Sequence, residues 1–539
     1  MTKQQITTEK QQQKLIKKAS VYIDEDKFDE AARCLHNAYT ENGKFNALIF
    51  YFLGMMYERT GNYMESINCL CHAAEFLKNP NNVISKDFEY KIFLRLAGSC
   101  ATAGFNKNAI IFFEEAYKRC NEPGKYNILT SYLYTMVADN TSPARILQCL
   151  HKVDEMIPVG EMDEKGTIPI EQKRSGNKIH VAYVSPDFRA HVMNHFYPPF
   201  LKYYDKSRFY VTCIYLTEKE DEYTKKAQAM VDEFKCCAGM KFTEIAAMLK
   251  AMQVDIAVDL AGFTANSGLL LFRYRVAPVQ ISGLGWMEST GLKETDYLIT
   301  DKFMDEPGHS YITEKPLYLK SCFCYVQDDE LPISTYAPCT KNGYITFGSF
   351  NRITKMTDEM LMVWREILDR VPNSRLLIKS GELHSKKMQF FLVERLKKIG
   401  IDPRHVILEK GSENYMKRYL DIDIALDTYP YTGGGTTFDA LYMGVPVISL
   451  YGKRRSSRFG RSILTNSGIG ELAVATPDEY VERAVALAND WELLDILHKN
   501  LRTMLEQSPA MDARGYVKEI EDQYKKILEE AIASTGFST

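Results

Sequence analysis

The sequence predicts an all-α domain of tetratricopeptide repeats followed by two α/β halves, each with a parallel, doubly wound sheet. A helix–turn–helix pattern recurs near the N-terminus, and from Lys178 short apolar runs alternate with amphipathic helical stretches in two successive series. A chain of 539 residues has room for about three or four domains. We expect four segments: helical repeats at 1–158, a linker at 159–177, a first α/β half at 178–335, and a second half with a terminal helix at 336–539.

The repeats are recognised by small residues where the two helices of a pair touch. Ala31, Ser66 and Ala109 occupy equivalent positions, spaced 35 and then 43 residues apart. The second spacing exceeds the usual ~34 residues, and the excess falls on the turn-rich segment Asn79–Asn82. One helical pair cannot bury its apolar face alone, so we expect the pairs to stack as a superhelix. A generic helical bundle is the alternative structure. If the segment is a repeat array, its short length suits docking of a partner or homo-oligomerisation.

The overall composition is that of an ordinary globular protein. Lys and Arg number 67 and Asp and Glu number 70, giving a net charge of −3, which argues against a surface built for nucleic acid or an anionic membrane. No stretch is long and apolar enough for a transmembrane helix, and the polar segment Met1–Lys18 lacks the apolar core of a secretory signal. The 12 cysteines show no metal-ligand spacing, so we expect free thiols in a cytoplasmic protein.

The strands of the two halves are expected at the short apolar runs. In the first half these are residues 179–184, 210–215 and 255–260, and the series closes near Asp301. In the second half they are residues 344–348, 375–379, 406–408, 424–427 and 445–449. Helices are expected between them, and two such Rossmann-like halves place a ligand cleft at the carboxyl ends of the strands.

The strongest local signal is the glycine-rich segment Asp427–Asp439, which follows the strand at 424–427. Glycines allow the backbone to approach a phosphate closely, and the N–H groups of the following helix N-terminus can bind it. The alternative is a glycine turn closed by a capping box, because Thr436 and Asp439 have that spacing. No Gly-Lys-Ser/Thr follows, so the segment is not a Walker A loop.

A lysine and two histidines follow the first strands of the two halves. Lys355, after the strand at 344–348, could neutralise a leaving diphosphate; the alternative is a solvated surface charge. His191 and His195, after the strand at 179–184, are four residues apart and suit hydrogen bonds to a sugar or phosphate, or proton transfer. No third ligand accompanies them, so we expect no metal there, and ordinary packed histidines are the alternative.

A basic run, Lys453–Arg461, holds five cations in nine residues after the strand at 445–449. We interpret it as an anion-facing loop or a solvated loop rather than a nucleic-acid patch, because only one aromatic residue interrupts it. Together with Lys355 and Lys379, these cations follow the strands of the second half, where a diphosphate would lie.

The motifs taken together resemble those of the nucleocytoplasmic protein O-GlcNAc transferases and of their plant relative, the SPINDLY protein O-fucosyltransferase. The resemblance covers nearly the whole chain and is clearest from Lys178 to Asp490. Its marks, in chain order, are Tyr183–His191, Gly262–Thr264, Arg275–Gln280, Asp296–Asp301, Phe350–Lys355, Val371–Ser374, Leu426–Thr428 and Thr436–Pro446. So many blocks in this order are far more specific than any one of them.

The resemblance implies a GT-B glycosyltransferase fold, in which two Rossmann-like domains hold a nucleotide-sugar. It implies an inverting, metal-independent transfer of a sugar to a protein Ser or Thr hydroxyl, with no cofactor beyond the donor. The donor expected first is UDP-GlcNAc, with GDP-fucose second and UDP-glucose third. The acceptor protein or peptide would be held by the repeats and the cleft.

The resemblance also assigns roles to site residues. Lys355 matches the family lysine that contacts the diphosphate, His191 the histidine beside the donor sugar, and Asp439 the acidic residue that binds the nucleotide ribose. The other residues expected to bind the donor are Gly262, Thr264, Asn351, Arg352, Lys379, Gly434, Gly435, Thr436 and Thr437. The residues expected to contact an anion or the acceptor are Arg458, Arg461 and His195.

Three departures from the family pattern surround the expected donor. The family's Gly-Tyr-Pro-Gly-Thr-Ser-Gly segment reads differently here, at Gly285–Gly291, and Gly434 and Tyr415 stand where the animal enzyme has histidines. Because of these changes, the sequence does not determine the nucleobase or the sugar of the donor. The residue that acts as the general base of the reaction is also unassigned. Two further hypotheses stand beside the transferase: a nucleotide-sugar epimerase on the same architecture, and a non-catalytic scaffold whose repeats bind a partner.

Overall fold

The computed structural model describes residues 3–42, 46–78, 86–121, 124–156, 178–286, 288–308 and 311–534. The turn-rich segment Asn79–Asn82 and the expected linker at 159–177 lie outside these ranges. The chain packs into two compact units whose segments alternate along the sequence. The first unit comprises Met1–Asn140, Phe350–Met362 and Ile378–Ser412, and the second comprises Thr141–Ser349, Val363–Leu377 and Glu413–Thr539.

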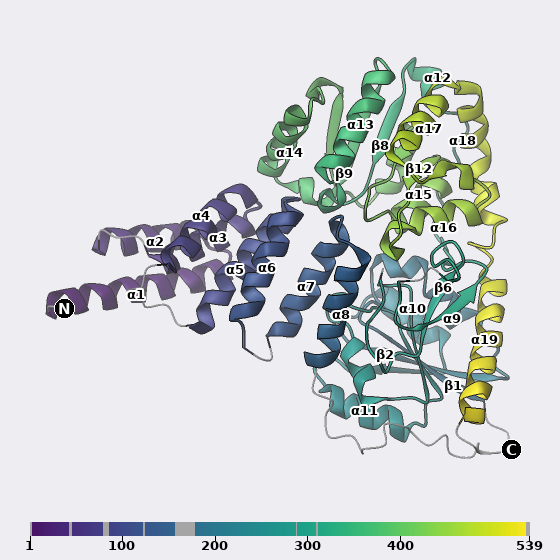
Figure 1. Ribbon diagram of the computed structural model, residues 1–539, viewed down its shortest axis with the longest axis horizontal. Coiled ribbons are helices and arrows are strands. Elements are labelled where there is room, and N and C mark those ends of the chain that lie inside the picture. The colour runs from purple at the N-terminus through teal and green to yellow at the C-terminus, as the bar shows by residue number, and fades with distance from the viewer. Residues whose placement is uncertain are drawn as a thin grey trace. The chain divides into compact units, whose positions relative to one another are not determined.

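The first unit opens with helices that pack as successive pairs. They are α1 (Lys3–Asp24), α2 (Phe28–Asn42), α3 (Ala47–Arg59), α4 (Tyr63–Phe76), α5 (Lys86–Thr102), α6 (Asn106–Arg119) and α7 (Lys125–Ala138). α1 packs on α2, α3 on α4, and α5 on α6 (Figure 1). The small residues Ala31, Ser66 and Ala109 are completely buried in these contacts. Oγ of Ser66 also lies 2.9 Å from Oγ of Ser99 on α5, so neighbouring pairs share a core, and the predicted helical repeats are confirmed.

Two kinds of local signal set the limits of the repeat helices. Gly61, between α3 and α4, and Gly104, between α5 and α6, have φ values of 72° and 84°, a left-handed conformation that glycine adopts without strain. Asn46 begins α3, because its Oδ1 accepts a 2.9 Å hydrogen bond from the N–H of Ile49. Nδ2 of Asn46 also donates to Oε1 of Gln12 over 3.2 Å, which ties α3 to α1.

The second unit contains a seven-stranded sheet in the order β3-β2-β1-β4-β5-β6-β7. Its strands are β1 (Ile179–Ser185), β2 (Phe209–Tyr215), β3 (Glu233–Cys236), β4 (Ile256–Asp259), β5 (Val279–Ser282), β6 (Tyr297–Asp301) and β7 (Lys315–Leu319). All of these neighbours pair in parallel, and β1 runs beside β2 from Ile179↔Phe209 to Ser185↔Tyr215. β4 and β5 are buried along their whole length, as expected for a parallel sheet that is covered on both faces.

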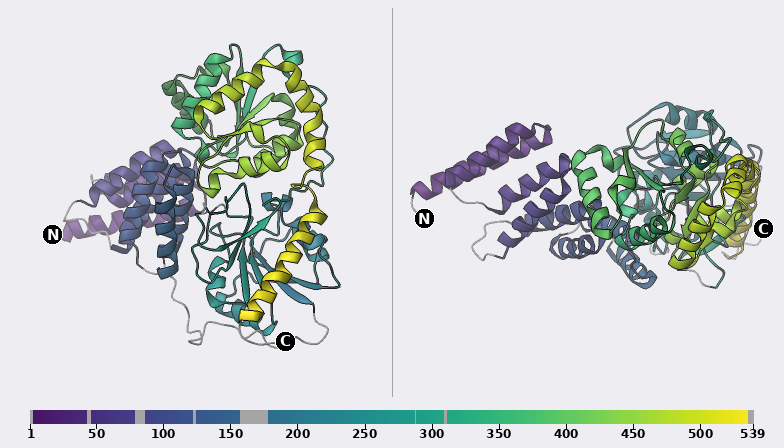
Figure 2. Two further views of the ribbon diagram at one scale, coloured as in Figure 1. Left: turned by 45° about the vertical axis from the view of Figure 1, so that its right-hand side comes forward. Right: turned by 90° about the horizontal axis from the view of Figure 1, so that it is seen from above.

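The second unit also contains these helices, which come from distant parts of the chain. They are α8 (Pro143–Met156), α9 (Pro198–Lys202), α10 (Glu222–Met230), α11 (Phe242–Ala251) and α19 (Ala513–Ser534). Ile245 and Leu249 of α11 share a core with Val184 of β1. α19 packs against α9, β5 and β7 although it ends the chain (Figure 2), and the hydroxyls of Tyr183 and Tyr524 lie 3.5 Å apart. By its position in the sequence, this terminal helix is predicted to belong to the second α/β half, at 336–539. In the structure it covers the first sheet.

The second sheet has six strands in the order β10-β9-β8-β11-β12-β13. They are β8 (Thr346–Ser349), β9 (Arg375–Ser380), β10 (Val406–Lys410), β11 (Ile424–Leu426), β12 (Val447–Leu450) and β13 (Ala473–Val474). The helices of this part are α12 (Cys339–Asn342), α13 (Asp358–Arg370), α14 (Lys386–Ile399), α15 (Gly435–Tyr442), α16 (Phe459–Asn466), α17 (Pro477–Asn489) and α18 (Trp491–Glu506). Counted from their own first strands, both sheets follow the Rossmann order 3-2-1-4-5, which confirms the predicted fold class.

None of the helices in the described ranges combines the length and the hydropathy of a membrane span. Within the same ranges, no three His, Cys, Asp or Glu side chains are grouped as ligands for a metal ion. The 12 cysteines are free thiols, as predicted, and all except Cys71 and Cys236 are buried.

Candidate functional site

The glycine-rich loop is folded around the carboxylate of Asp427, which directly follows β11. Oδ1 of Asp427 accepts hydrogen bonds from the N–H groups of Thr428 and Gly433, over 2.8 and 2.7 Å. Its Oδ2 accepts a 2.6 Å hydrogen bond from Oγ of Ser449 on β12. A Cβ atom at Gly433 would lie only 2.5 Å from Oγ1 of Thr436. The loop therefore closes around Asp427 only because position 433 carries no side chain.

The loop leads into α15, whose first residue is Gly435. The residue before it, Gly434, is the N-cap, and as a glycine it has no side chain that could cap this helix. Thr436 accordingly lies inside the helix, and the alternative of a capping box between Thr436 and Asp439 is wrong. The helix N-terminus instead follows a bent glycine backbone, an arrangement that suits an anionic group.

Asp439, in the second turn of α15, is held by two tyrosine hydroxyls. Tyr325 donates to Oδ1 and Tyr415 donates to Oδ2, each over 2.9 Å. The side chain is buried, and burial raises the pKa of Asp439, while His195 and the two tyrosine hydrogen bonds act in the opposite direction. Each carboxylate oxygen can accept a further hydrogen bond, so the tyrosines orient Asp439 without exhausting it.

His191 is the N-cap of the short helix η1 (Val192–His195), the first helix after β1. Its Nδ1 accepts a 3.4 Å hydrogen bond from the N–H of Met193 and lies 3.6 Å from Oδ2 of Asp187. Burial lowers the pKa of His191, and the neighbouring Asp187 acts to raise it. The ring is therefore neutral near pH 7, with its proton on Nε2, because Nδ1 is the acceptor. In this form the Nε2–H group of His191 is a hydrogen-bond donor.

The η1 segment touches α15 and the tyrosine that holds Asp439. The ring of His195 stacks on that of Tyr325 with centroids 5.2 Å apart. A Cβ atom at Gly435 would lie 2.8 Å from Cγ2 of Val192, so η1 and the start of α15 are in close contact. The second unit thus brings together the histidine segment after β1, the glycine loop and Asp439.

Gly262 and Thr264 lie in a turn that Asp259 fixes at the end of β4. The N–H of Gly262 donates to Oδ2 of Asp259 over 2.9 Å, and Oγ of Ser282 donates to the same atom over 2.7 Å. Gly262 has a φ of 57°, and a Cβ atom there would lie 2.1 Å from Cβ of Trp286. The glycine is therefore required by packing, whatever else it does.

Buried hydroxyls mark the carboxyl ends of the strands. Oγ1 of Thr264 after β4 and Oγ of Ser349 at the end of β8 have no hydrogen-bond partner within the described part of the chain. Buried polar atoms are seldom left unpaired, and ligands of open α/β sheets bind outside the carboxyl ends of the strands. These hydroxyls therefore make this edge of the sheets the candidate binding edge.

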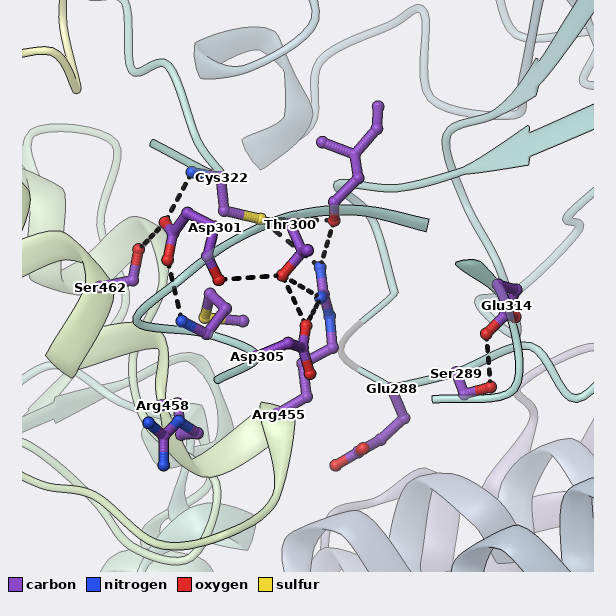
Figure 3. Close-up of polar contacts among 12 residues, drawn as sticks. Glu288, Ser289, Thr300, Asp301, Asp305, Glu314, Cys322, Arg455, Arg458 and Ser462 are labelled. Atoms are coloured by element: carbon purple, nitrogen blue, oxygen red, sulfur yellow. Dashed lines mark hydrogen bonds and ion pairs between the residues drawn. The ribbon is translucent and has the colours of Figure 1, made fainter. Parts of the chain in front are cut away.

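Three arginines of the basic run after β12, Arg454, Arg455 and Arg458, are buried rather than solvated. Arg455, in η7 (Arg455–Ser457), forms an ion pair with Asp305, which lies 150 residues earlier in the chain. It also donates to Oγ1 of Thr300 over 2.8 Å and to the carbonyl of Ile299 over 2.6 Å (Figure 3). Arg455 and Asp305 are 3% and 4% exposed. The expectation of a solvated loop is wrong here, because the partner of Arg455 lies outside any local pattern.

Arg458 and Arg461, expected to contact an anion or the acceptor, both bind Glu306. Their guanidinium nitrogens lie 2.7 and 2.6 Å from Oε1 of Glu306. These hydrogen bonds, that of Arg458 first, lower the pKa of Glu306. Arg458 also donates to the carbonyls of Phe303 and Gly452, each over 2.9 Å. In this structure the two arginines join the loop after β12 to the loop after β6.

The remaining expected donor-binding residues belong to the first unit. Lys355 ends the short helix η3 (Ile353–Lys355), and both Lys355 and Asn351 are buried. Nε of Arg352 lies 2.9 Å from Oε1 of Glu382 in an ion pair. The first unit therefore holds the Lys355 segment by its own contacts.

Lys379, at the end of β9, is bound to the neighbouring strand. Its Nζ donates to the carbonyl of Lys410 over 2.8 Å and lies 3.4 Å from Oε2 of Glu409. Lys379 is 7% exposed, so its charge is balanced within the sheet. Lys379 therefore links β9 to β10, a contact that the sequence pattern did not indicate.

Two residues that shape the site carry no local motif. Tyr325 acts on Asp439 from 114 residues away, and Glu382 acts on Arg352 from 30 residues away. The only sequence signal for Glu382 is its place just after β9, at the carboxyl end of a strand. Tyr325 has no such signal, since it lies in an irregular segment between the two sheets.

Comparison with known proteins identifies relatives over most of the chain. The family model described as "Glycosyl transferase family 41" matches residues 147–331 and 334–520. A protein of Arabidopsis thaliana named "Probable UDP-N-acetylglucosamine--peptide N-acetylglucosaminyltransferase SPINDLY" is 34% identical over 358 residues, 65% of this chain and 39% of that protein. The protein of the same name from Petunia hybrida is 33% identical over 64% of this chain and 38% of its own length. The matches thus span less than two fifths of these curated relatives.

A solved structure shares the architecture. A mutant of the Thermobaculum terrenum O-GlcNAc transferase superposes with a TM-score of 0.80, covering 99% of this chain and 100% of that one at 23% identity. At this identity the likeness shows the fold, which is a GT-B arrangement of two Rossmann-like halves after helical repeats.

Proposed function

Because the chain belongs to glycosyl transferase family 41, we propose that it transfers a sugar from a nucleoside-diphosphate sugar to Ser or Thr hydroxyls of a protein. The first-choice reaction is transfer of GlcNAc from UDP-GlcNAc, the reaction in the names of the SPINDLY relatives. The observation that carries the proposal is the N-terminus of α15, which begins after the N-cap glycine Gly434 and follows the loop that Asp427 shapes. Glycine backbone and helix N–H groups at the carboxyl end of β11 suit a diphosphate.

The residues of the second unit would orient the donor. Asp439, oriented by Tyr325 and Tyr415, would accept hydrogen bonds from the ribose hydroxyls. His191 would donate from Nε2 to the sugar or the diphosphate, since its Nδ1 is engaged with Met193. This assignment makes His191 a hydrogen-bond donor in the ground state and leaves the general base to another group.

Lys355 would stabilise the leaving nucleotide. A buried cation near the diphosphate offsets the charge that develops as the glycosidic bond breaks, which is what a divalent metal does in other transferases. We therefore propose that turnover needs no added metal, and activity should persist in a chelator. We further propose that the protein acts in the cytoplasm, where its 12 free cysteines stay reduced.

A nucleotide panel tests the donor. UDP, GDP, UDP-GlcNAc, UDP-glucose and GDP-fucose are added to the full-length protein, and the midpoint of thermal unfolding is measured, because only a ligand of the native site raises it. UDP and UDP-GlcNAc should raise the midpoint. A shift with GDP and GDP-fucose alone would replace the proposed donor by GDP-fucose, and no shift with any nucleotide would favour a non-catalytic scaffold.

The matching activity assay uses Lys355→Met. The unmodified protein should hydrolyse its donor slowly without acceptor and label an acceptor protein, detected as a mass increase of one sugar. Loss of the lysine should lower kcat by about 10²–10³-fold, the usual cost of one charge-stabilising group. Full activity of Lys355→Met would show that the role assigned to the lysine is wrong, and a changed sugar without transfer to protein would indicate an epimerase.

A further inference from the structure

The segment that carries Lys355 packs on the repeat helices. Within the first unit, the turn between α5 and α6 meets this segment and α14. A Cβ atom at Gly104 would lie 2.9 Å from Nη1 of Arg395 on α14, and the rings of Phe105 and Phe391 are 5.7 Å apart, edge to face. The preceding turn of the array also takes part, because Oγ of Ser385 donates to the carbonyl of Gly61 over 3.4 Å.

The two peptide carbonyls on either side of Lys355 are held by side chains. Nδ2 of Asn106, the first residue of α6, donates to the carbonyl of Thr354 over 3.3 Å. Nη2 of Arg395 donates to the carbonyl of Met356 over 2.7 Å. Asn106 and Arg395 are 4% and 8% exposed, so water competes little for these carbonyls.

The residues before Lys355 are fixed in the same way. Oε2 of Glu382 accepts a 3.1 Å hydrogen bond from the N–H of Ile353, and Oε1 accepts from Nε of Arg352. Burial alone would raise the pKa of Glu382, but the hydrogen bonds from Ser380 and Arg352 outweigh it and lower the pKa. Glu382 is therefore ionised at neutral pH and binds both the backbone N–H of Ile353 in η3 and the side chain of Arg352 just before it.

Asn106 stands out because it comes from the repeat array. Its Nδ2 also donates to the carbonyl of Ala138 at the end of α7, over 3.3 Å, so one amide joins two repeat helices to the backbone of Thr354. Nearby, Nζ of Lys107 and Oε1 of Glu359 form an ion pair over 2.9 Å, but both side chains are more than 60% exposed. An exposed pair of this kind contributes little, whereas the amide of Asn106 is buried.

We propose that the repeat array does more than dock an acceptor: through Asn106 it positions Lys355 for the chemical step. This rests on the proposed function, in which Lys355 faces the diphosphate. Nζ of a lysine moves with its backbone, and a displacement of about 1 Å in a catalytic group can cost about a hundredfold in rate. Asn106 is thus a positioning residue, and the turn of the array that carries it contributes to the chemical step.

The test uses donor turnover in the absence of any acceptor, which removes the docking role of the repeats. Asn106→Ala should lower kcat for donor hydrolysis by about tenfold, with a smaller change in KM, because the lost interaction acts mainly on the leaving diphosphate. The matched control is Asn46→Ala, which removes the cap of α3 and its bond to α1. This control should lower the unfolding midpoint of the array and leave donor hydrolysis unchanged.

A double-mutant comparison separates positioning from general damage. The affinity for UDP and GDP is measured by calorimetry in four proteins: the unmodified protein, Asn106→Ala, Lys355→Met and the double variant. This measurement does not require turnover. If Asn106 acts through Lys355, its substitution weakens nucleotide binding several-fold in the unmodified background and not in Lys355→Met. Arg395→Met, which frees the carbonyl of Met356, should repeat this pattern if Asn106→Ala does not fold.

The opposite outcomes are distinct. Equal loss of donor hydrolysis in Asn106→Ala and Asn46→Ala, or the same loss of nucleotide affinity in both backgrounds, would show that Asn106 only stabilises the array. Donor binding and hydrolysis that are unchanged in Asn106→Ala would also overturn the inference. If the unmodified protein binds neither UDP nor GDP, the proposed function itself fails, and the inference fails with it.

Discussion

The hydroxyl of Tyr415 donates a 2.9 Å hydrogen bond to Oδ2 of Asp439. Tyr415 comes from η6 (Tyr415–Asp421) and Asp439 from the helix that follows the glycine loop. The bond opposes the effect of burial, which raises the pKa of Asp439. Tyr415 therefore sustains the charge of the carboxylate that we assign to the nucleotide ribose.

Replacing this tyrosine should make nucleotide binding more sensitive to acid. In Tyr415→Phe the carboxylate loses a donor, so the pKa of Asp439 rises further and the group protonates at a higher pH as the solution is acidified. The affinity for UDP should fall by about threefold to tenfold near neutral pH and should be lost at a higher pH than in the unmodified protein. Calorimetric titrations between pH 5 and pH 8 measure this shift.

The matched control is Tyr204→Phe, which removes a hydroxyl bonded over 2.8 Å to Oδ2 of Asp232 in the first α/β half. Its binding profile should superimpose on that of the unmodified protein. An identical profile for Tyr415→Phe would mean that Asp439 does not bind the nucleotide in its ionised form.

The ion pair of Arg455 and Asp305 should be essential for stability. Removing one member leaves a buried charge without a partner, which typically costs about 3–5 kcal/mol. Arg455→Ala should lower the free energy of unfolding by this amount, measured by urea denaturation, and the double variant Arg455→Met with Asp305→Leu should recover much of it. Arg404→Ala, which removes an exposed pair with Asp402, should leave the denaturation midpoint unchanged. Equal effects of the two arginine variants would contradict this account of the pair.

The sequence predicts most elements of this fold because the periodic patterns are local. The helix at Lys386–Ile399 and the strand at 179–184 each carry their own apolar pattern, and the structure forms both. The strands that no pattern marked are short or at an edge, such as β3 (Glu233–Cys236) and β13 (Ala473–Val474). In these strands partial exposure weakens the apolar signal.

What the sequence could not predict depends on long-range contacts. The packing of the Lys355 segment on α6 joins residues 248 positions apart at Asn106 and Thr354, and Arg455 finds its partner 150 positions away. No spacing rule connects such residues. The glycine loop was recognisable because glycines between a strand and a helix are a local signal, but the start of α15 at Gly435, which places Thr436 inside the helix, was visible only in the structure.

His498 should make the protein less stable in mild acid. It is completely surrounded by protein, and burial lowers its pKa from 6.5 to about 4. The unfolded chain therefore binds a proton at a higher pH than the native one, so the stability that depends on neutral His498 is complete above about pH 6.5 and is lost as the pH falls toward 4. Between pH 7 and pH 4.5 this loss amounts to about 2 kcal/mol.

The comparison variant is His498→Gln, whose amide can donate to the carbonyl of Asp423 as Nε2 of His498 does over 2.9 Å. Urea denaturation at pH 7 and pH 4.5 should show a smaller loss of stability for this variant. Equal losses would show that His498 does not carry the acid sensitivity.

Gly262 offers a test of why a glycine follows β4. Its φ of 57° is left-handed, and a Cβ atom would also lie 2.1 Å from Cβ of Trp286. Gly239 has a similar φ of 75°, but a Cβ atom there meets nothing within 4 Å.

Each Gly→Ala change carries the backbone strain of about 1–2 kcal/mol, and the clash at Gly262 adds about 1–3 kcal/mol more. Gly262→Ala should therefore destabilise the protein clearly more than Gly239→Ala in urea denaturation. It should also weaken UDP binding, because Gly262 lies two residues before Thr264, whose buried hydroxyl marks the candidate binding edge. Equal destabilisation by the two variants would mean that Trp286 yields freely, and the glycine at 262 would then reflect backbone conformation alone.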